Sequence, residues 1–243
     1  MKWKPELEEF LSGKTEGEVF EKSTIFNILK LMNKGEVETI DFPISTGKEG
    51  NVFRGRKGKQ LIAVKIYRIN TITFRNISNY LKYEERLPKK RDRRSIIYAW
   101  AQKEFSNLKK LYDAGVRVPE PIAMEGNVIV MEYIGDEEIA APLLKDAEIN
   151  DARKIFEEIV ENILLMYQKA HLVHADLSEY NILVWDEEPV IIDVGQTVRR
   201  SNPMAFSFLE RDVENLVHFF KKFFPVEKDY VMKKLQEDEH EVC

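Results

Sequence analysis

The sequence predicts an α+β fold in which a β-rich lobe comes first and a helical lobe follows. Short β-rich segments separated by glycines fill much of residues 37–67. Amphipathic patterns at residues 150–168 and 206–224 predict long helices in the second half. No internal repeat, low-complexity tract or Gly/Ser linker divides the 243 residues. This change of pattern along one chain indicates two lobes with a cleft between them.

The N-terminal half combines strands with helical segments. Residues 1–35 have helical character, with Phe26, Leu29 and Met32 at helical spacing before Gly35. Four strands are expected, at residues 37–44, 51–54, 61–67 and 128–134.

Three amphipathic helices are expected further along the chain. The first covers residues 95–112 and ends before Gly115. The second runs from an Asn150 cap to residue 168, and the third covers residues 206–224. The apolar stripes of the first two helices are Ile97, Trp100, Ala101, Leu108 and Leu111, and then Ile155, Ile159, Ile163 and Tyr167. Two short strands, 182–185 and 190–193, are joined by a turn at 186–189.

The composition excludes several classes of protein. Lys and Arg number 37 and Asp and Glu 42, which gives a net charge of −5, so a general nucleic-acid binder is not expected. No apolar run approaches the roughly 18 residues that a membrane span needs, and the N-terminus lacks a signal-peptide core. Cys243 is the one cysteine, which excludes an intrachain disulfide. A soluble, cytoplasmic protein without a membrane partner is expected.

Residues 45–52, Ser-Thr-Gly-Lys-Glu-Gly-Asn-Val, lie between two expected strands. Gly47 and Gly50 let backbone amides approach a ligand closely, and successive amides in such a turn attract phosphate. The pattern is G-x-G-x-x-G-x-V with Ser45 in place of the first glycine. A plain hairpin turn is the alternative interpretation.

Lys65 and Glu104 are both charged residues at apolar positions. Lys65 lies inside the strand pattern Leu-Ile-Ala-Val-Lys-Ile-Tyr, and burial of its charge is costly unless it is paired. Glu104 falls on the apolar stripe of its helix. We expect the two to pair, although an edge-strand lysine and a stripe-edge glutamate that both reach solvent remain the alternatives.

A third constellation combines two carboxylates and an amide. Asp176 and Asn181 are five residues apart on a loop between a helix and a strand, and Asp193 ends the next strand beside Gly195. Hard oxygen ligands of this kind suit Mg²⁺ or Mn²⁺. A carboxylate that stays off the metal can align a hydroxyl or a water. A turn that is merely rich in Asp and Asn is the alternative.

These motifs carry a family resemblance. A glycine loop, a strand lysine, a helix glutamate, D-x-x-x-x-N and D-x-G, in that order, resemble the protein-kinase signature set. The segments STGKEGNVF, VKIY, WAQKEFSNLKKL, VPEPI, HADLSEYNILV and IIDVGQ resemble the RIO atypical serine/threonine protein kinase family over residues 45–224. The Rio-one type is favoured, because the 44 residues before Ser45 leave too little room for the winged-helix domain of the Rio-two type.

The resemblance implies a trimmed, two-lobed protein-kinase-like fold with one main helix in its β-rich N-lobe. Only 50 residues follow Asp193 and no A-P-E is present, so neither a full activation segment nor the peptide-binding helices are expected. Ala175 replaces the Arg of H-R-D. The implied boundaries are a single RIO-type domain over 1–243, an N-terminal helix plus N-lobe over 1–134, a hinge at 131–135 and a C-lobe over 136–243.

The resemblance also implies ATP and Mg²⁺ or Mn²⁺ as cofactors. Asp176 would be the catalytic base or align the nucleophile, whereas Asn181 and Asp193 would bind the metal, and Asp193 is a candidate acceptor of a phosphoryl group. Lys65 would hold the phosphates. The implied ATP-binding residues are Ser45, Gly47, Lys48, Glu49, Gly50, Val52, Ala63, Lys65, Glu104, the gatekeeper Met131, the backbone of Glu132 and Ile134, and Ile192.

Asp212 lies in Phe-Leu-Glu-Arg-Asp, which resembles a family segment whose Asp anchors the catalytic loop. We expect its carboxylate to accept backbone amides near residues 174–176. A surface aspartate on an amphipathic helix is the alternative.

The implied function is a metal-dependent serine/threonine kinase or ATPase that acts in maturation of the small ribosomal subunit and autophosphorylates on serine. The alternatives are a small-molecule phosphotransferase of the aminoglycoside-kinase type and a non-catalytic assembly factor that uses nucleotide as a switch. Residues 82–94 hold seven basic and three acidic residues and are the candidate RNA contact on a pre-ribosomal particle. Ser78 and Ser95 are candidate phosphoacceptors.

Overall fold

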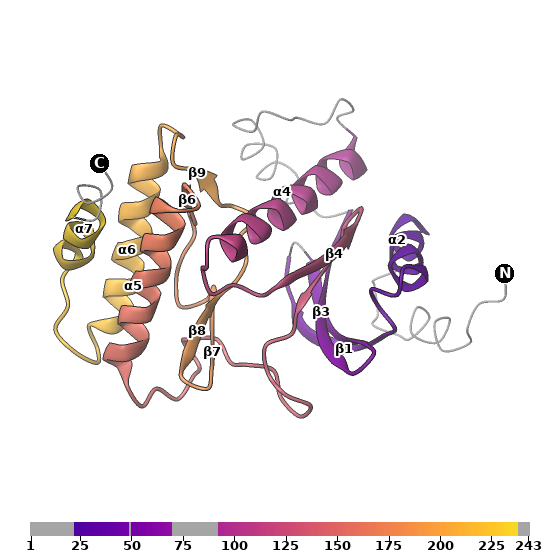
Figure 1. The fold of residues 1–243 in the computed structure, drawn as a ribbon, viewed down its shortest axis with the longest axis horizontal. Helices are drawn as coiled ribbons and strands as arrows, with labels where there is room; N and C mark the ends of the chain where they lie inside the picture. The colour runs from indigo at the N-terminus through magenta and orange to yellow at the C-terminus, as the bar shows by residue number, and fades with distance from the viewer. Residues whose placement is uncertain (1–21, 49, 70–91, 238–243) are drawn as a thin grey trace.

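The computed structural model describes residues 22–48, 50–69 and 92–237. As expected, a β-rich part comes first along the chain and a helical part follows (Figure 1). The first part contains α2 (Lys22–Asn33), β1 (Thr39–Thr46), β2 (Gly50–Lys57), β3 (Gln60–Tyr67), α4 (Arg93–Asp113), β4 (Pro121–Glu125) and β5 (Val128–Glu132). The second part contains α5 (Ala152–Gln168), β6 (Leu172–Val173), β7 (Ile182–Trp185), β8 (Glu188–Ile191), β9 (Val198–Arg199), α6 (Ala205–Phe220) and α7 (Lys228–Glu237).

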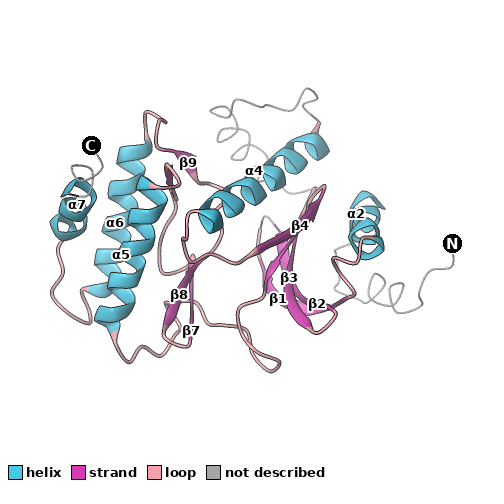
Figure 2. Ribbon diagram, viewed as in Figure 1, coloured by secondary structure: helices cyan, strands magenta, loops and turns pink. Residues whose placement is uncertain are grey.

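The N-terminal sheet has five antiparallel strands in the order β1-β2-β3-β5-β4, and helices α2 and α4 lie on its two sides (Figure 2). Because side chains alternate along a strand, Ile62, Val64 and Ile66 of β3 form one apolar cluster with Ile28 and Leu31 of α2. Tyr67 belongs to the opposite cluster, together with Trp100 of α4. The same alternation puts Lys65 on the α4 side of a central strand, so the edge-strand interpretation is wrong.

Helix α2 forms as expected, but the regularly spaced apolar residues are not the ones it buries most deeply. Phe26 is 60% exposed, whereas Thr24, Asn27, Ile28 and Leu31 are buried. The side-chain amide of Asn27 donates to Asn127 Oδ1 at 2.9 Å, and this buried hydrogen bond holds the polar face inward. Periodicity of apolar residues alone did not reveal this pairing. The rest of the helical pattern over residues 1–21 lies outside the described residues.

Helix α4 follows the prediction closely, and its whole predicted apolar stripe is buried. Asp92 caps the N-terminus, since its carboxylate accepts the backbone N–H of Ser95 at 3.0 Å. Gly115, with a φ of 84°, lies just past the C-terminus, where a left-handed residue ends a helix at low cost. Strand β4, at the sheet edge, was not expected, because Pro121 and the short mixed sequence obscure its pattern.

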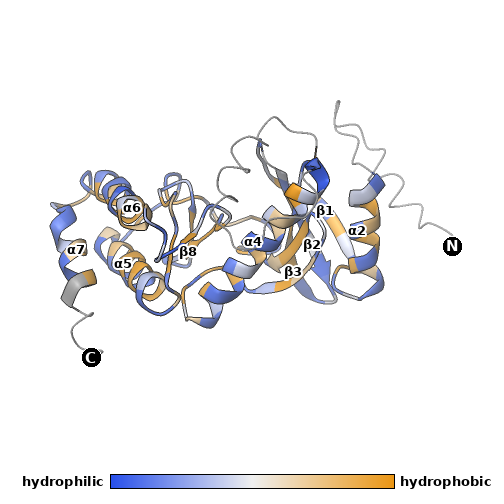
Figure 3. Ribbon diagram, turned by 90° about the horizontal axis from the view of Figure 1, so that it is seen from above, coloured by the Kyte–Doolittle hydropathy of each residue, from blue (hydrophilic) through white to orange (hydrophobic). Residues whose placement is uncertain are grey.

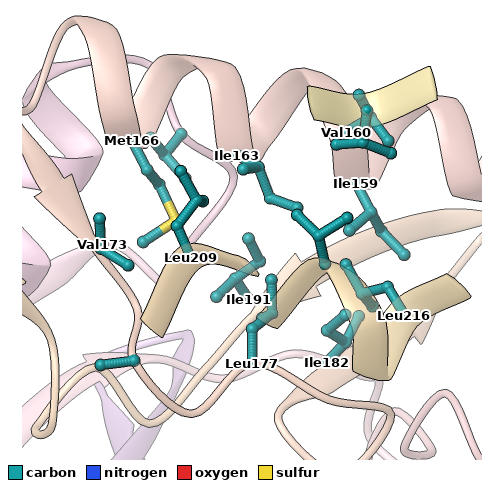
Figure 4. Packing of buried hydrophobic residues seen from close by; sticks show 14 of the residues in the cluster. Ile159, Val160, Ile163, Met166, Val173, Leu177, Ile182, Ile191, Leu209 and Leu216 are labelled. Carbon is teal, nitrogen blue, oxygen red and sulfur yellow. The ribbon is translucent and has the colours of Figure 1, made fainter. Parts of the chain in front are cut away.

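The C-terminal core lies between α5, α6 and the short strands (Figure 4). The apolar sides of α5 and α6 face one another, while their outer sides are hydrophilic (Figure 3). Asp151 rather than Asn150 caps α5, because its carboxylate accepts the Lys154 N–H at 2.9 Å, whereas the Asn150 amide donates to Glu187. The last predicted helix ends at Phe220, four residues early. None of the helices in the described ranges is long and apolar enough to span a bilayer.

Candidate active site

Lys65 and Glu104 form the ion pair that the sequence predicts. Nζ of Lys65 lies 2.7 Å from Oε1 of Glu104, and the two side chains are only 13% and 5% exposed. Strand β3 supplies the lysine and α4 supplies the glutamate, so the contact ties the helix to the sheet. The solvent-reaching alternatives for both residues are therefore wrong.

Lys65 also contacts Asp193, with Nζ 2.9 Å from Oδ1. Burial lowers the pKa of Lys65, but Asp193 and Glu104 outweigh it, and the net shift is upward. The charge of Lys65 in turn lowers the pKa of Asp193. Both groups are therefore ionised at neutral pH. The side chain of Asp193 is 43% exposed, so its carboxylate remains accessible to a ligand.

The β1–β2 hairpin contains the predicted glycine loop. Ser45 lies opposite Val52 in the register, and the Gly47 N–H donates to the Gly50 carbonyl at 2.9 Å. Gly50 lies close to β3, because a Cβ atom at this position would be 2.4 Å from the Ile66 carbonyl oxygen. Lys48 is exposed. Glu49 lies outside the described residues.

The expected adenine-facing residues share one side of the sheet. Val52 is directly opposite Lys65, and Ala63 is directly opposite Met131. Residues opposite one another in an antiparallel pair project to the same face. Val52, Ala63 and Met131 therefore lie on the Lys65 side, as an adenine pocket next to the phosphate-binding lysine requires.

Backbone hydrogen bonds hold residues 132–134, which lead from β5 to the second part of the chain. The Ile134 carbonyl accepts the Ala141 N–H at 3.0 Å, so a contact of Ile134 with adenine must use its own N–H. The side chain of Glu132 pairs with Arg117 at 2.9 Å, and its backbone N–H donates to Glu120. For Glu132, the backbone carbonyl is the group that can accept from adenine.

Asp176 lies in the loop of residues 174–181, the candidate catalytic loop, and is held from two sides. The amide nitrogen of Asn181 donates to the backbone carbonyl of Asp176 at 2.8 Å, and that of Gln196 donates to Asp176 Oδ2 at 3.1 Å. Burial raises the pKa of Asp176, and Asp193 adds to the effect, whereas His174 opposes it. Asp176 is thus an oriented carboxylate with raised basicity. Gln196 was not among the predicted site residues, although its place directly after Asp193-Val-Gly195 was a signal.

Asp212 anchors this loop, as predicted. Its carboxylate accepts the backbone N–H of Ala175 at 2.8 Å and that of Leu177 at 3.0 Å. Asp212 is 2% exposed, and burial raises its pKa to about 7 although both amides and Arg211 oppose the shift. The Arg211 guanidinium also donates to the Ala175 carbonyl. Ala175 has a φ of 67°. In this conformation its N–H and its carbonyl both contact side chains of α6.

His174 is buried beside the loop as a neutral imidazole. Its Nε2 lies 3.0 Å from the Ile192 carbonyl, which can only accept, so Nε2 carries the hydrogen. Nδ1 is buried and has no hydrogen-bond partner among the residues that the structure describes. Burial therefore lowers the pKa of His174. Ile192 donates its N–H to the Asn181 carbonyl, which links the loop to the residue before Asp193.

The residues present suit a divalent metal shared with phosphates. Within the described ranges, no group of three or more His, Cys, Asp or Glu side chains can hold a metal by itself. Asn181 uses its amide nitrogen toward Asp176, so Oδ1 is the atom that would ligate a metal, and Asp193 would contribute an accessible carboxylate. Mg²⁺ is commonly held by one or two such oxygen ligands together with substrate phosphates. This donor set fits that pattern.

Comparison with known proteins identifies the family. The model of the RIO domain matches residues 51–233, which include the ion pair, the catalytic loop and Asp212. The chain belongs to the RIO kinase family. The Haloferax volcanii RIO-type serine/threonine-protein kinase Rio1 is 41% identical over 211 residues, which cover 86% of this chain and 72% of the relative. The kinase of the same name from Thermoplasma acidophilum is 42% identical over 172 residues, which cover 70% of this chain and 90% of the relative.

The RIO kinase fold is also seen in solved structures. The Rio2 kinase–ADP/Mg²⁺–phosphoaspartate complex from Chaetomium thermophilum has a TM-score of 0.68 and 24% identity, and covers 90% of this chain and 70% of that one. The trimmed two-lobed fold predicted from the sequence is thereby confirmed. In this RIO kinase, α6 begins at Ala205, twelve residues after Asp193, so no full activation segment intervenes.

The predictions for the basic segment and for the phosphoacceptor serines of the RIO kinase stay untested. Most of the basic segment 82–94 and Ser78 lie outside the described residues, while Arg93 and Arg94 begin α4. The hydroxyl of Ser95 donates to Asp92 at 2.8 Å as part of the α4 cap, a position that does not favour it as a phosphoacceptor.

Proposed function

We propose that this RIO kinase transfers the γ-phosphoryl group of ATP, with Mg²⁺ or Mn²⁺, to a serine hydroxyl or to water. The observation that carries the proposal is the chain of contacts from Glu104 through Lys65 to Asp193, which lies close enough to the oriented Asp176 to raise its pKa. A lysine fixed between two carboxylates is placed to hold phosphates in a defined position.

The residues of the chain divide the chemistry among themselves. Lys65 binds the phosphates, and Glu104 keeps its ammonium group in place. Asp176 accepts the proton of the attacking hydroxyl, since its raised pKa favours proton uptake. Gln196 orients its carboxylate, and Asn181 holds its backbone carbonyl. Asn181 and Asp193 would hold the metal, which would supply positive charge to the phosphates.

A second acceptor is Asp193 itself. The solved Rio2 complex contains a phosphoaspartate, and the Asp193 carboxylate here is ionised and accessible. In this route a carboxylate oxygen forms a bond to the γ-phosphorus as the bond to ADP breaks. Water then attacks the acyl phosphate, releases inorganic phosphate and restores Asp193. The net reaction is ATP hydrolysis. A chain that follows this route would act mainly as an ATPase.

The experiment is to incubate the purified chain with γ-labelled ATP and Mg²⁺ or Mn²⁺. Free phosphate, acid-stable phosphoserine and hydroxylamine-labile label are counted separately. Hydroxylamine-labile label that disappears in Asp193→Asn supports the acyl phosphate, and acid-stable label supports serine autophosphorylation. Absence of all three products in the presence of metal would contradict the proposed function.

We further propose that a small-subunit pre-ribosomal particle is the partner. The support is the family resemblance together with the basic segment 82–94 in an otherwise acidic chain. Lysine and arginine contacts with phosphates make affinity fall steeply with salt. Joint neutralisation of Lys89, Lys90, Arg91, Arg93 and Arg94 should weaken binding to small-subunit RNA and flatten its salt dependence. Unchanged affinity and salt slope would exclude this segment as the RNA contact.

A further inference from the structure

Lys103 is a buried lysine directed at the segment that follows Asp193. It is 8% exposed, and its Nζ donates to the backbone carbonyls of Gly195 and Thr197, each at 2.7 Å. Nζ also lies 5.1 Å from the ring centre of Trp100. Two short, charge-assisted hydrogen bonds to backbone oxygens make this a specific attachment of the segment to α4.

Two neighbours on α4 hold the same segment. The Asn107 amide nitrogen donates to the Val194 carbonyl at 3.1 Å. Gly195 lies against the Trp100 indole, since a Cβ atom there would be 3.2 Å from Cζ2. Positions 100, 103, 104 and 107 share one side of a helix. One side of α4 therefore holds both Glu104 and the attachment of residues 194–197.

These contacts form a closed series of interactions that includes Lys65, the proposed phosphate-binding residue. Glu104 holds Lys65, Lys65 holds Asp193, and residues 194–197 return the chain to α4 through Lys103 and Asn107. Asp193 has a φ of 60°, a backbone conformation that needs support from its surroundings. The attachment is made directly after this residue.

We propose that Lys103 and Asn107 are positioning residues that hold Asp193 in its nucleotide-ready orientation before ATP or metal binds. The side chains of α4 hold Asp193 in this orientation, so a long phosphorylated activation segment is not needed for it. The inference rests on the proposed function, because it assigns Asp193 to the metal and phosphates. It predicts that residues 194–197 are closed onto α4 in the nucleotide-free protein.

The first test uses hydrogen–deuterium exchange on the nucleotide-free chain. Lys103→Met keeps the aliphatic length but removes both hydrogen bonds, so peptides that span residues 193–199 should exchange at least about tenfold faster. Lys109→Met, an exposed lysine on the same helix, is the matched control and should leave exchange unchanged. Equal exchange in wild type and Lys103→Met would overturn the inference. If Lys103→Met does not fold, the smaller truncation Asn107→Ala is measured and judged by the same result.

The second test separates positioning from general stability. The Mg²⁺ concentration that gives half-maximal turnover should rise at least about tenfold in Lys103→Met, while affinity for metal-free ATP stays unchanged. Lys103→Arg keeps a cationic donor and should restore most of the metal affinity. A lower melting temperature with an unchanged metal requirement would show a merely structural role. Absence of metal-dependent turnover in wild type would contradict the proposed function, whereas the exchange result would still decide the positioning role.

Discussion

Nζ of Lys65 lies 2.9 Å from Oδ1 of Asp193, although the two residues are 128 positions apart in the chain. The contact joins a central strand of the N-terminal sheet to the segment after β8. Glu104 holds the same ammonium group from α4. Strand β3 supplies the cation, and α4 and the segment after β8 each supply a carboxylate that pairs with it. Substitutions of these three residues should therefore differ in their effects on stability and binding.

Lys65→Met should destabilise the protein more than Glu104→Gln. The first change leaves the buried Glu104 without its cation, at a cost of about 3–5 kcal/mol, whereas the second leaves Lys65 paired with Asp193. The double variant should cost less than the sum of the single variants. Urea denaturation of all four proteins measures this coupling. Additive free energies of unfolding would mean that the pair does not interact.

Asp176→Asn should lower turnover by about 10²–10⁴-fold, because an amide cannot accept the proton of the nucleophile. ATP affinity should stay close to that of wild type, since Asp176 does not hold the phosphates. Single-turnover kinetics and equilibrium nucleotide binding provide the two measurements. Near-wild-type turnover would remove Asp176 from the mechanism.

Asp193→Ala should abolish the effect of Mg²⁺ on nucleotide affinity. The wild-type chain should bind ATP at least about tenfold more tightly with the metal than without it, and the variant should show no such difference. Lys65 keeps Glu104 as its partner in the variant, so affinity for metal-free ATP should persist. Calorimetric titrations with and without Mg²⁺ test this. A preserved metal effect would show that Asp193 is not a ligand.

Asp212→Asn should impair the catalytic loop without touching the nucleotide. An asparagine has one acceptor oxygen, so one of the Ala175 and Leu177 amides loses its partner, at a cost of about 1–3 kcal/mol. Turnover should fall while ATP affinity is retained. Asp229→Asn is a suitable control, because Asp229 lies in the first turn of α7. Unchanged turnover and stability would show that the anchor is dispensable.

His174 predicts a loss of stability toward acid. Burial lowers its pKa in the folded state, so below about 6.5 the unfolded chain binds a proton that the folded chain does not. The stability that neutral His174 provides is therefore complete above that pH and is lost as the pH falls. Relative to His174→Gln, wild type should lose up to about 1.4 kcal/mol per pH unit below 6.5. Urea titrations from pH 5 to 8 measure the difference, and parallel curves would contradict the prediction.

The sequence predicted the paired charges because burial leaves few alternatives for them. Lys65 lay within an apolar strand and Glu104 on an apolar stripe, and each required the other. Asp212 could be placed by its resemblance to a family segment, and the two amide contacts confirm it.

Contacts to backbone atoms were beyond reach of the sequence. Lys103 and Asn107 bind carbonyl oxygens, and a carbonyl has no signature in residue type. The buried face of α2 was out of reach for another reason: Asn27 faces inward because of a side-chain partner, Asn127, that lies 100 positions away. Asn150 and Asp151 are both good capping residues, and only the fold shows which one is used.

The Lys103 attachment also bears on the design of inhibitors. A compound that requires residues 194–197 to swing out must break both hydrogen bonds of the buried Lys103 ammonium. Loss of a hydrogen bond to a charged group costs about 1.5–3 kcal/mol, so loss of both reduces affinity by about a hundredfold or more. Compounds that leave this segment in place avoid that loss. The design of inhibitors of this protein should therefore begin from nucleotide-like scaffolds that bind while residues 194–197 stay attached to α4.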